Sequence, residues 1–136
     1  MPIPERSEYE KLIYGLPNRF PEIASSTLRI YSTSASAGTL RGVIILKNGV
    51  GIEAVEVLDF ATGIIRKYSY IIYRGKQKIR WYDPQPHPNN VELATTFPHH
   101  FHEEPDIKHN RKPAPGISFD SPNLPMLMEV CARLED

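Results

Sequence analysis

All five histidines of the chain fall between His87 and His109, and three of them share one short string, Thr96-Phe97-Pro98-His99-His100-Phe101-His102. A second dense string lies just upstream and reads Ile79-Arg80-Trp81-Tyr82-Asp83-Pro84-Gln85-Pro86-His87-Pro88. Together the two strings combine cations, aromatic rings, a carboxylate and imidazoles. Imidazole changes charge near neutral pH and is a common metal ligand. We therefore expect any chemistry of this protein to involve these two strings.

One interpretation of the histidine string is a metal site. Zinc binds nitrogen and oxygen ligands of this kind, and the candidates are His99, His100 and His102 together with His87, Asp83 or Glu103. The spacing matches no established zinc pattern, so we expect no resident metal and no other cofactor.

A second interpretation is acid–base chemistry on RNA. Metal-independent cleavage needs a base for the 2′-hydroxyl, an acid for the leaving oxygen and a cation for the developing charge. The predicted catalytic residues are Arg80, His87, His99, His100 and His102. The structural alternative is that the rings only cap backbone groups in an irregular loop.

The elements that must position these residues are β-strands. If Gly75-Lys76 is a two-residue turn, Ile72 faces Ile79 and Tyr70 faces Trp81, and these four side chains form a core face. The other face then carries cations and aromatic rings, as single-stranded nucleic-acid surfaces do: Lys67, Ser69, Ile71, Tyr73, Lys78, Arg80 and Tyr82. A solvated sheet face is the alternative, and a register slip of one residue would exchange the faces. The predicted substrate-binding residues are Lys67, Tyr68, Tyr70, Lys78, Tyr82 and Asp83.

The 136 residues predict one domain of the α+β class. We expect an N-terminal helix and connection over 1–26, an antiparallel meander of four to six strands over 27–83, an irregular Pro/His-rich loop over 84–120 and a C-terminal helix over 121–136. Both helices are predicted to pack on one face of the sheet. Asn48-Gly49 marks a hairpin turn, Ser7 and Glu10 fit a helix capping box, and a bulge would reconcile the opposite parities of Glu53 and Glu56.

Composition narrows the function classes. Sixteen basic and sixteen acidic residues give a formal net charge of zero, which argues against a general polyanion binder. The stretch from Phe60 to Tyr82 nevertheless holds six cations and no acid. A single cysteine, Cys131, excludes an internal disulfide and lies on the apolar stripe of the last helix, which indicates a buried thiol. Without a membrane span or signal peptide, we expect a soluble cytoplasmic protein.

Three strings in order resemble the TumE family of small prokaryotic proteins. They are Arg66-Lys67-Tyr68-Ser69-Tyr70, then Arg80-Trp81-Tyr82-Asp83 leading to His87-Pro88, then Thr96 to His102. Where the family often has Asn-Ala-Pro-His-His after the aspartate, this chain reads Pro84-Gln85-Pro86-His87-Pro88, so one histidine is missing.

The resemblance implies a toxin whose partner is a small helix-turn-helix antitoxin. An RNA or ribosome target is our inference from Arg80, the tyrosines and the histidines, and a homodimer is also open. Two other hypotheses remain at this point: a non-enzymatic interaction domain with an aromatic surface, since aromatics and arginine also dominate protein interfaces, and a metal-dependent hydrolase.

Overall fold

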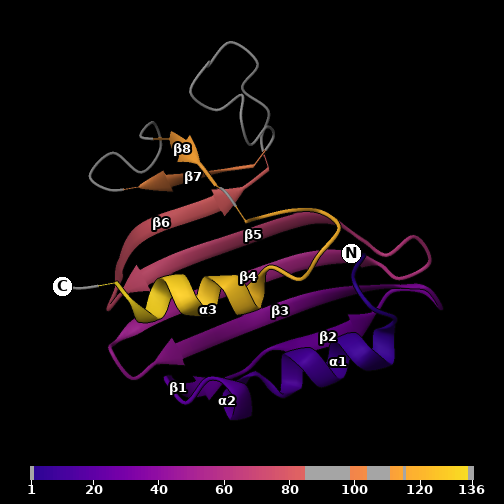
Figure 1. The fold of residues 1–136 in the computed structure, drawn as a ribbon, viewed down its shortest axis with the longest axis horizontal. Helices are drawn as coiled ribbons and strands as arrows, with labels where there is room; N and C mark the ends of the chain where they lie inside the picture. Colours follow the sequence, from indigo (N-terminus) through magenta and orange to yellow (C-terminus); the bar gives the residue numbers. More distant parts are fainter. Residues whose placement is uncertain (1, 85–98, 104–110, 115, 135–136) are drawn as a thin grey trace.

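A single antiparallel sheet forms the centre of the molecule (Figure 1). This computed structural model describes residues 2–84, 99–103, 111–114 and 116–134, and among these the side chains of residues 100, 111 and 113 are left out of the description. The strands are β1 (Ile23–Ser26), β2 (Arg29–Ser32), β3 (Ala37–Leu46), β4 (Val50–Asp59), β5 (Ile64–Arg74), β6 (Gln77–Asp83), β7 (His100–Glu103) and β8 (Arg111–Pro113). The helices are α1 (Arg6–Tyr14), α2 (Leu16–Arg19) and α3 (Leu124–Ala132).

The predicted α+β class and the antiparallel meander are confirmed, but the sheet is wider than the four to six strands expected. Seven strands lie in the order β1-β3-β4-β5-β6-β7-β8, and β2 also pairs with β3, so the sheet has eight strands. Part of the difference lies in the stretch 84–120, which was predicted to be irregular. Its described residues include β7, paired with β6, and β8, paired with β7.

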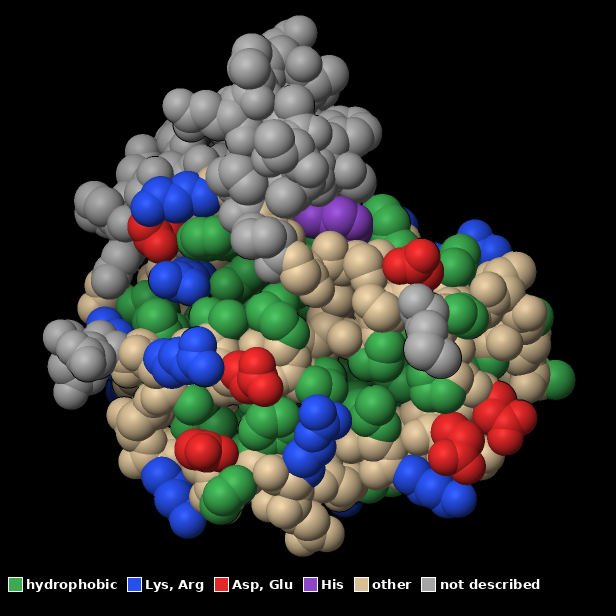
Figure 2. Space-filling view, viewed as in Figure 1, with side chains coloured by type: hydrophobic (Ala, Val, Ile, Leu, Met, Phe, Trp, Pro, Cys, Tyr) green, Lys and Arg blue, Asp and Glu red, His purple; other side chains and the backbone are tan. Residues whose placement is uncertain are grey.

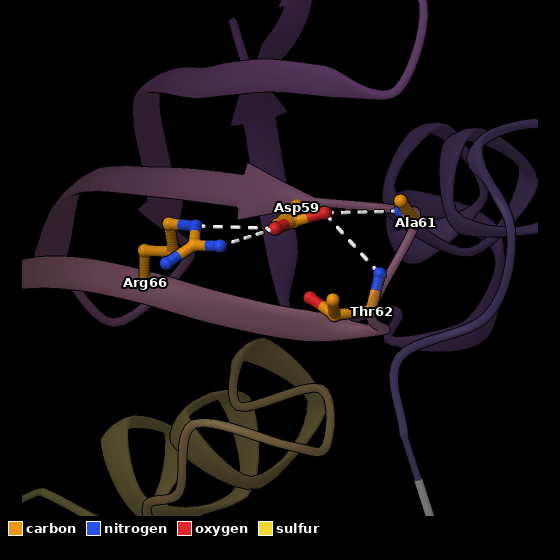
Figure 3. A network of polar contacts seen from close by, with 4 residues as sticks. All are labelled: Asp59, Ala61, Thr62 and Arg66. Atoms are coloured by element: carbon orange, nitrogen blue, oxygen red, sulfur yellow. Dashed lines mark hydrogen bonds and ion pairs between the residues drawn. The ribbon is translucent and has the colours of Figure 1, made fainter.

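Tight turns join the long central strands. The predicted hairpin at Asn48-Gly49 is present between β3 and β4, and Gly49 adopts a φ of 89°, which a side chain would disfavour. Between β4 and β5, the Asp59 carboxylate accepts hydrogen bonds from the backbone of Ala61 (3.0 Å) and Thr62 (3.2 Å) and from the Arg66 guanidinium at 2.6 and 3.1 Å (Figure 3). One carboxylate thus holds both the turn and the start of the returning strand.

A buried carboxylate links the helical segments to one face of the sheet. Glu56 on β4 is fully buried and accepts hydrogen bonds from the hydroxyls of Tyr9 on α1 and Tyr70 on β5. The Asn123 side chain, just before α3, donates to the Tyr70 hydroxyl at 3.1 Å. α1 and the segment that leads into α3 therefore lie on the same side of the sheet, which is the side turned toward the viewer in Figure 1.

Two local predictions are wrong. No bulge separates Glu53 from Glu56, because β3 and β4 pair without a shift from Ala37 to Ile45, and Glu56 instead points into the core. The capping box is absent as well: Glu5 is the N-cap of α1, no side chain caps it, and the Ser7 hydroxyl bonds to Glu5.

One face of the sheet carries the helices α1 and α3, and the other face is more exposed to solvent. On the side that carries α1 and α3, charged side chains are scattered among apolar ones without gathering into one patch (Figure 2). On the opposite side, which we call the open face, the alternate residues of β3, β4 and β5 are partly or fully exposed: Thr39, Arg41, Val43 and Ile45, then Glu53, Val55 and Val57, then Lys67, Ser69, Ile71 and Tyr73. No helix in the described part of the chain is long and apolar enough to cross a membrane.

Candidate functional site

A bulge in β6 decides which side chains reach the open face. Arg74 pairs with Gln77, as the predicted Gly75-Lys76 turn requires, but the register shifts by one residue between Tyr73 and Ile72. Trp81 therefore pairs with Ile71, and Tyr82 pairs with Tyr70. The expected pairing of Tyr70 with Trp81 is wrong, because a bulge inserts one extra residue and turns every later side chain to the other face.

The three tyrosines of the central hairpin lie on the core side of the sheet, Tyr82 because of the bulge and Tyr68 and Tyr70 because β5 turns them that way. Tyr70 is fully buried and its hydroxyl is bonded to Glu56 and Asn123. Tyr82 and Tyr68 are each 4% exposed. The three tyrosines that were predicted to bind substrate thus pack in the core, where a base could not stack on them.

Trp81 takes the place on the open face that had been assigned to Tyr82. Its indole N–H donates to the Ser69 hydroxyl at 3.1 Å, and its ring lies parallel to the His102 imidazole, with ring centres 5.0 Å apart. The Lys78 ammonium lies 5.8 Å from the centre of the indole, and His102 Nε2 lies 3.5 Å from Asp83 Oδ1. We call Ser69, Lys78, Trp81, Asp83 and His102 the Trp81 cluster.

The Trp81 cluster joins an exposed end to a buried end. Lys78 is exposed and Trp81 is partly buried, whereas Asp83 and His102 are almost fully enclosed. A carboxylate next to an imidazole fixes the orientation of the ring and stabilises the imidazolium when it forms. The exposed end of the cluster can hold an anion at Lys78 beside the partly buried ring of Trp81, and the enclosed end holds an imidazole, His102, that could move a proton only once it is uncovered.

His99 lies on the side of the sheet that carries α3. The Tyr68 hydroxyl and His99 Nδ1 are 2.6 Å apart, and the imidazole also packs against Phe119, with ring centres 4.6 Å apart. Burial, together with the nearby Asp83 carboxylate, raises the pKa of Tyr68 above its ordinary value. The phenol therefore stays protonated, and the tautomer of His99 sets which of the two groups donates.

Arg80 and His102 lie on opposite faces of the sheet. It pairs with Glu103 on β7, its Nε lies 3.6 Å from the Glu103 carboxylate, and its guanidinium lies 5.0 Å from the centre of the Phe101 ring. Because Trp81 pairs with His102, the sheet separates Arg80 from His102. His99 is two residues beyond Phe101 on the Arg80 side, so the two backbones are roughly 13 Å apart at the usual rise of a strand. Arg80 also donates to the Tyr82 hydroxyl at 3.4 Å, so its guanidinium lies on the face that carries His99 and opposite the face that carries His102. The gathering of Arg80 with His87, His99 and His100 stays a prediction.

The other predicted site residues are only partly placed. His87 and the side chain of His100 lie outside the described residues, as do Phe97 and Pro98, which were expected to anchor and aim the loop. Of the predicted substrate-binding residues on β5, Lys67 is exposed on the open face, whereas Tyr70, three positions along the strand, is buried on the other face. Among the residues that the structure describes, no group of three or more His, Cys, Asp or Glu side chains is arranged to hold a metal ion.

Sequence reasoning missed two features. Trp81 was assigned to the core, and only the register could have shown otherwise. The buried Glu56 carried a readable signal, because it shares its parity with Ile52, Ala54 and Leu58, all of which are buried.

Comparison with known proteins agrees with the three strings found in the sequence. The family model for the toxin TumE matches residues 13–133, which is most of the chain and includes every strand and α3. No curated protein and no solved structure shows a significant match. Because the match covers far more than half of the sequence, this chain belongs to the TumE toxin family.

Proposed function

We infer that this protein is the toxin of a toxin–antitoxin pair and that it blocks translation by binding RNA on the open face of its sheet. Membership of a toxin family supports the first part of this proposal. The second part rests on the Trp81 cluster, in which a cation, a partly buried aromatic ring and an imidazole–carboxylate pair lie next to one another.

The Trp81 cluster suits single-stranded RNA better than a duplex. Bases of a single strand are free to stack on an aromatic ring, and stacking contributes about 1–3 kcal/mol per base. Phosphates on either side of such a base would meet Lys78 and Lys67, which are exposed and have no carboxylate partner among the described residues. Net charge close to zero does not oppose this, because a local groove of cations is enough to follow a short strand.

If RNA is also cleaved, the same cluster supplies the groups. His102 is enclosed in the free protein, so RNA would first have to uncover it. Its imidazole would then take the proton of a 2′-hydroxyl, whose oxygen would attack the adjacent phosphorus and displace the 5′-oxygen, and the resulting imidazolium would give that proton to the leaving 5′-oxygen. Asp83 would orient the imidazole, and Lys78 would replace Arg80 as the cation beside the phosphate. This reaction requires no metal, because acid, base and cation are all side chains.

The proposal is tested by expressing the protein alone and following growth and cellular RNA. Lys78→Glu is the informative variant, because Lys78 is exposed and its replacement leaves the core intact. Lys76→Glu is the matched control, since Lys76 is equally exposed in the adjacent turn and lies outside the cluster. We expect Lys78→Glu to relieve growth arrest and to weaken RNA binding. The slope of log Kd against the logarithm of salt concentration should fall by about the amount that one phosphate contact contributes.

Equal toxicity and equal RNA affinity of the Lys78→Glu variant and its Lys76→Glu control would contradict the RNA site. Loss of toxicity with RNA affinity unchanged would favour the alternative of a protein-interaction domain. Cleavage abolished by EDTA would favour the metal-dependent hydrolase instead.

A further inference from the structure

A second part of the open face has features of a protein interface. Of the four large hydrophobic side chains exposed in the described residues, three lie at this part of the sheet: Tyr31 (56% exposed), Ile45 (40%) and Val57 (37%). A hollow of about 490 Å³ lies beside Tyr31, and its lining includes Tyr31, Arg41, Val43, Glu53 and Val55. We call these five residues, together with Val57, the β2–β4 patch.

The β2–β4 patch holds one cation, Arg41, and one acid, Glu53, and among the described residues only the acid has a partner. Arg41 pairs directly with Arg29 across β2 and β3, and like charges placed opposite each other destabilise a sheet. Arg29 bonds to the Leu28 carbonyl and lies over the Tyr14 ring, whereas Arg41 has no hydrogen-bond or carboxylate partner within the described part of the chain. The one acid of the patch, Glu53, accepts a hydrogen bond from Tyr73 at 3.2 Å. The patch therefore matches a partner that brings a carboxylate.

The apolar residues of the patch favour a protein over RNA. Val43, Val55 and Val57 are β-branched side chains, which pack against other apolar side chains and give no ring on which a base can stack. A second copy of the chain is a poor partner. In a twofold dimer the same surface meets itself, so Arg41 of each copy would meet only one acid, Glu53, which already accepts a hydrogen bond from Tyr73.

We propose that the β2–β4 patch is the docking surface for a segment of the antitoxin, with apolar side chains in the hollow and an Asp or Glu on Arg41. The proposal rests on the toxin role and is independent of the RNA mechanism. β4 pairs with β5 along its length, so a segment bound at the patch lies beside the strand that carries Lys67 and Ser69. The antitoxin would then neutralise the toxin by covering the neighbouring part of the open face.

The experiment uses the full-length toxin and the antitoxin encoded by the neighbouring gene as the probe. Arg41→Glu and Val55→Lys change the patch, and Lys47→Glu is the control because Lys47 is an exposed cation in the turn at the end of β3. We expect each patch variant to weaken antitoxin binding about tenfold or more by calorimetry, which is about 1.4 kcal/mol. The Lys47→Glu control should bind as the unchanged protein does.

In cells, the patch variants should arrest growth like the unchanged toxin but escape rescue by the antitoxin. Unchanged antitoxin affinity in both patch variants would overturn the proposal. So would loss of toxicity and RNA affinity with antitoxin binding retained, because the patch would then belong to the RNA site. Thermal unfolding checks that each variant is folded, and Arg41→Glu, at an exposed position, carries the test if Val55→Lys does not fold. Calorimetry decides the proposal even if RNA proves not to be the target.

Discussion

The hydroxyl of Tyr70 is predicted to contribute more to stability than any exposed tyrosine hydroxyl in the described part of the sheet. Tyr70→Phe removes a hydrogen bond to the buried Glu56 carboxyl and removes the acceptor for Asn123 Nδ2. A hydrogen bond to a charged group contributes about 1.5–3 kcal/mol and a neutral one about 1 kcal/mol. We expect the free energy of unfolding to fall by about 3 kcal/mol, which lowers Tm by about 10 °C in a domain of this size.

Tyr73→Phe is the matched control. Tyr73 lies on the same strand and its hydroxyl also bonds to a glutamate, Glu53, at 3.2 Å, but on the open face. Such a surface change should stay within about 0.5 kcal/mol. Denaturant unfolding of the two variants at pH 7 measures the difference, and equal losses in both would refute the view that Glu56 is the buried link between α1, β5 and the start of α3.

The same network predicts how stability depends on pH. Burial raises the pKa of Glu56, and the hydrogen bonds from Tyr70 and Tyr9 act against that rise. A raised pKa means that the folded state holds the proton more tightly, so stability is greatest below the ordinary glutamate pKa of about 4.3 and falls as pH rises through the folded pKa. Tyr70→Phe should extend that loss to higher pH, whereas Glu56→Gln should remove the Glu56 contribution. Unfolding midpoints measured between about pH 4 and 8 give the pH dependence of stability. If the midpoint of Glu56→Gln changes with pH as steeply as that of the unchanged protein, Glu56 is not the group responsible.

Three further predictions concern the frame of the site. Gly42→Ala should lower stability by about 1–3 kcal/mol, because an added Cβ would lie 2.7 Å from backbone atoms of Leu28 at a φ of 151°, and thermal unfolding measures the loss. Asp59→Asn should destabilise the β4–β5 turn at pH 7 and by less as the pH is lowered. The hydrogen bond from Arg66 lowers the pKa of Asp59, so the carboxylate stabilises the turn fully above its ordinary pKa and that stabilisation is lost as the pH falls through the lowered pKa; a loss that does not shrink on acidification would be inconsistent with this. Burial raises the pKa of the Cys131 thiol to about 12, so labelling by a disulfide reagent at pH 8 should proceed only as fast as the protein opens; rapid labelling of the folded protein would argue against a buried thiol.

The sequence was sufficient for the features that depend on local pattern. The two hairpin turns at Asn48-Gly49 and Gly75-Lys76 follow from glycine and its neighbours, and the strands around them follow from alternating apolar residues. The family could also be identified, because its motifs follow one another in order along the chain, and the family model matches residues 13–133. These signals are carried by neighbouring residues and need no knowledge of distant contacts.

The features that could not be predicted depend on pairing between strands. The bulge in β6 requires no special residue type, yet it exchanges Trp81 and Tyr82 between the faces. The pairing of Trp81 with His102 on β7 then places Arg80 on the opposite face from that histidine. β7 was taken for a loop because its residues, His100 to Glu103, have little intrinsic preference for a strand, and it exists through pairing with β6. Pairing between strands that are distant in the sequence, such as β6 and β7, gives no recognisable residue pattern in either strand by itself.

The central claim is that this toxin stops translation by acting on RNA through the Trp81 cluster. The most direct measurement adds the purified protein to a cell-free translation reaction programmed with one defined messenger RNA. It follows amino-acid incorporation and the length of that RNA together. We predict that synthesis stops with the unchanged protein and the Lys76→Glu control and continues with Lys78→Glu, while the messenger is bound or shortened only where synthesis stops. Undiminished synthesis with the unchanged, folded protein, or arrest that is equal in Lys78→Glu, would contradict the claim.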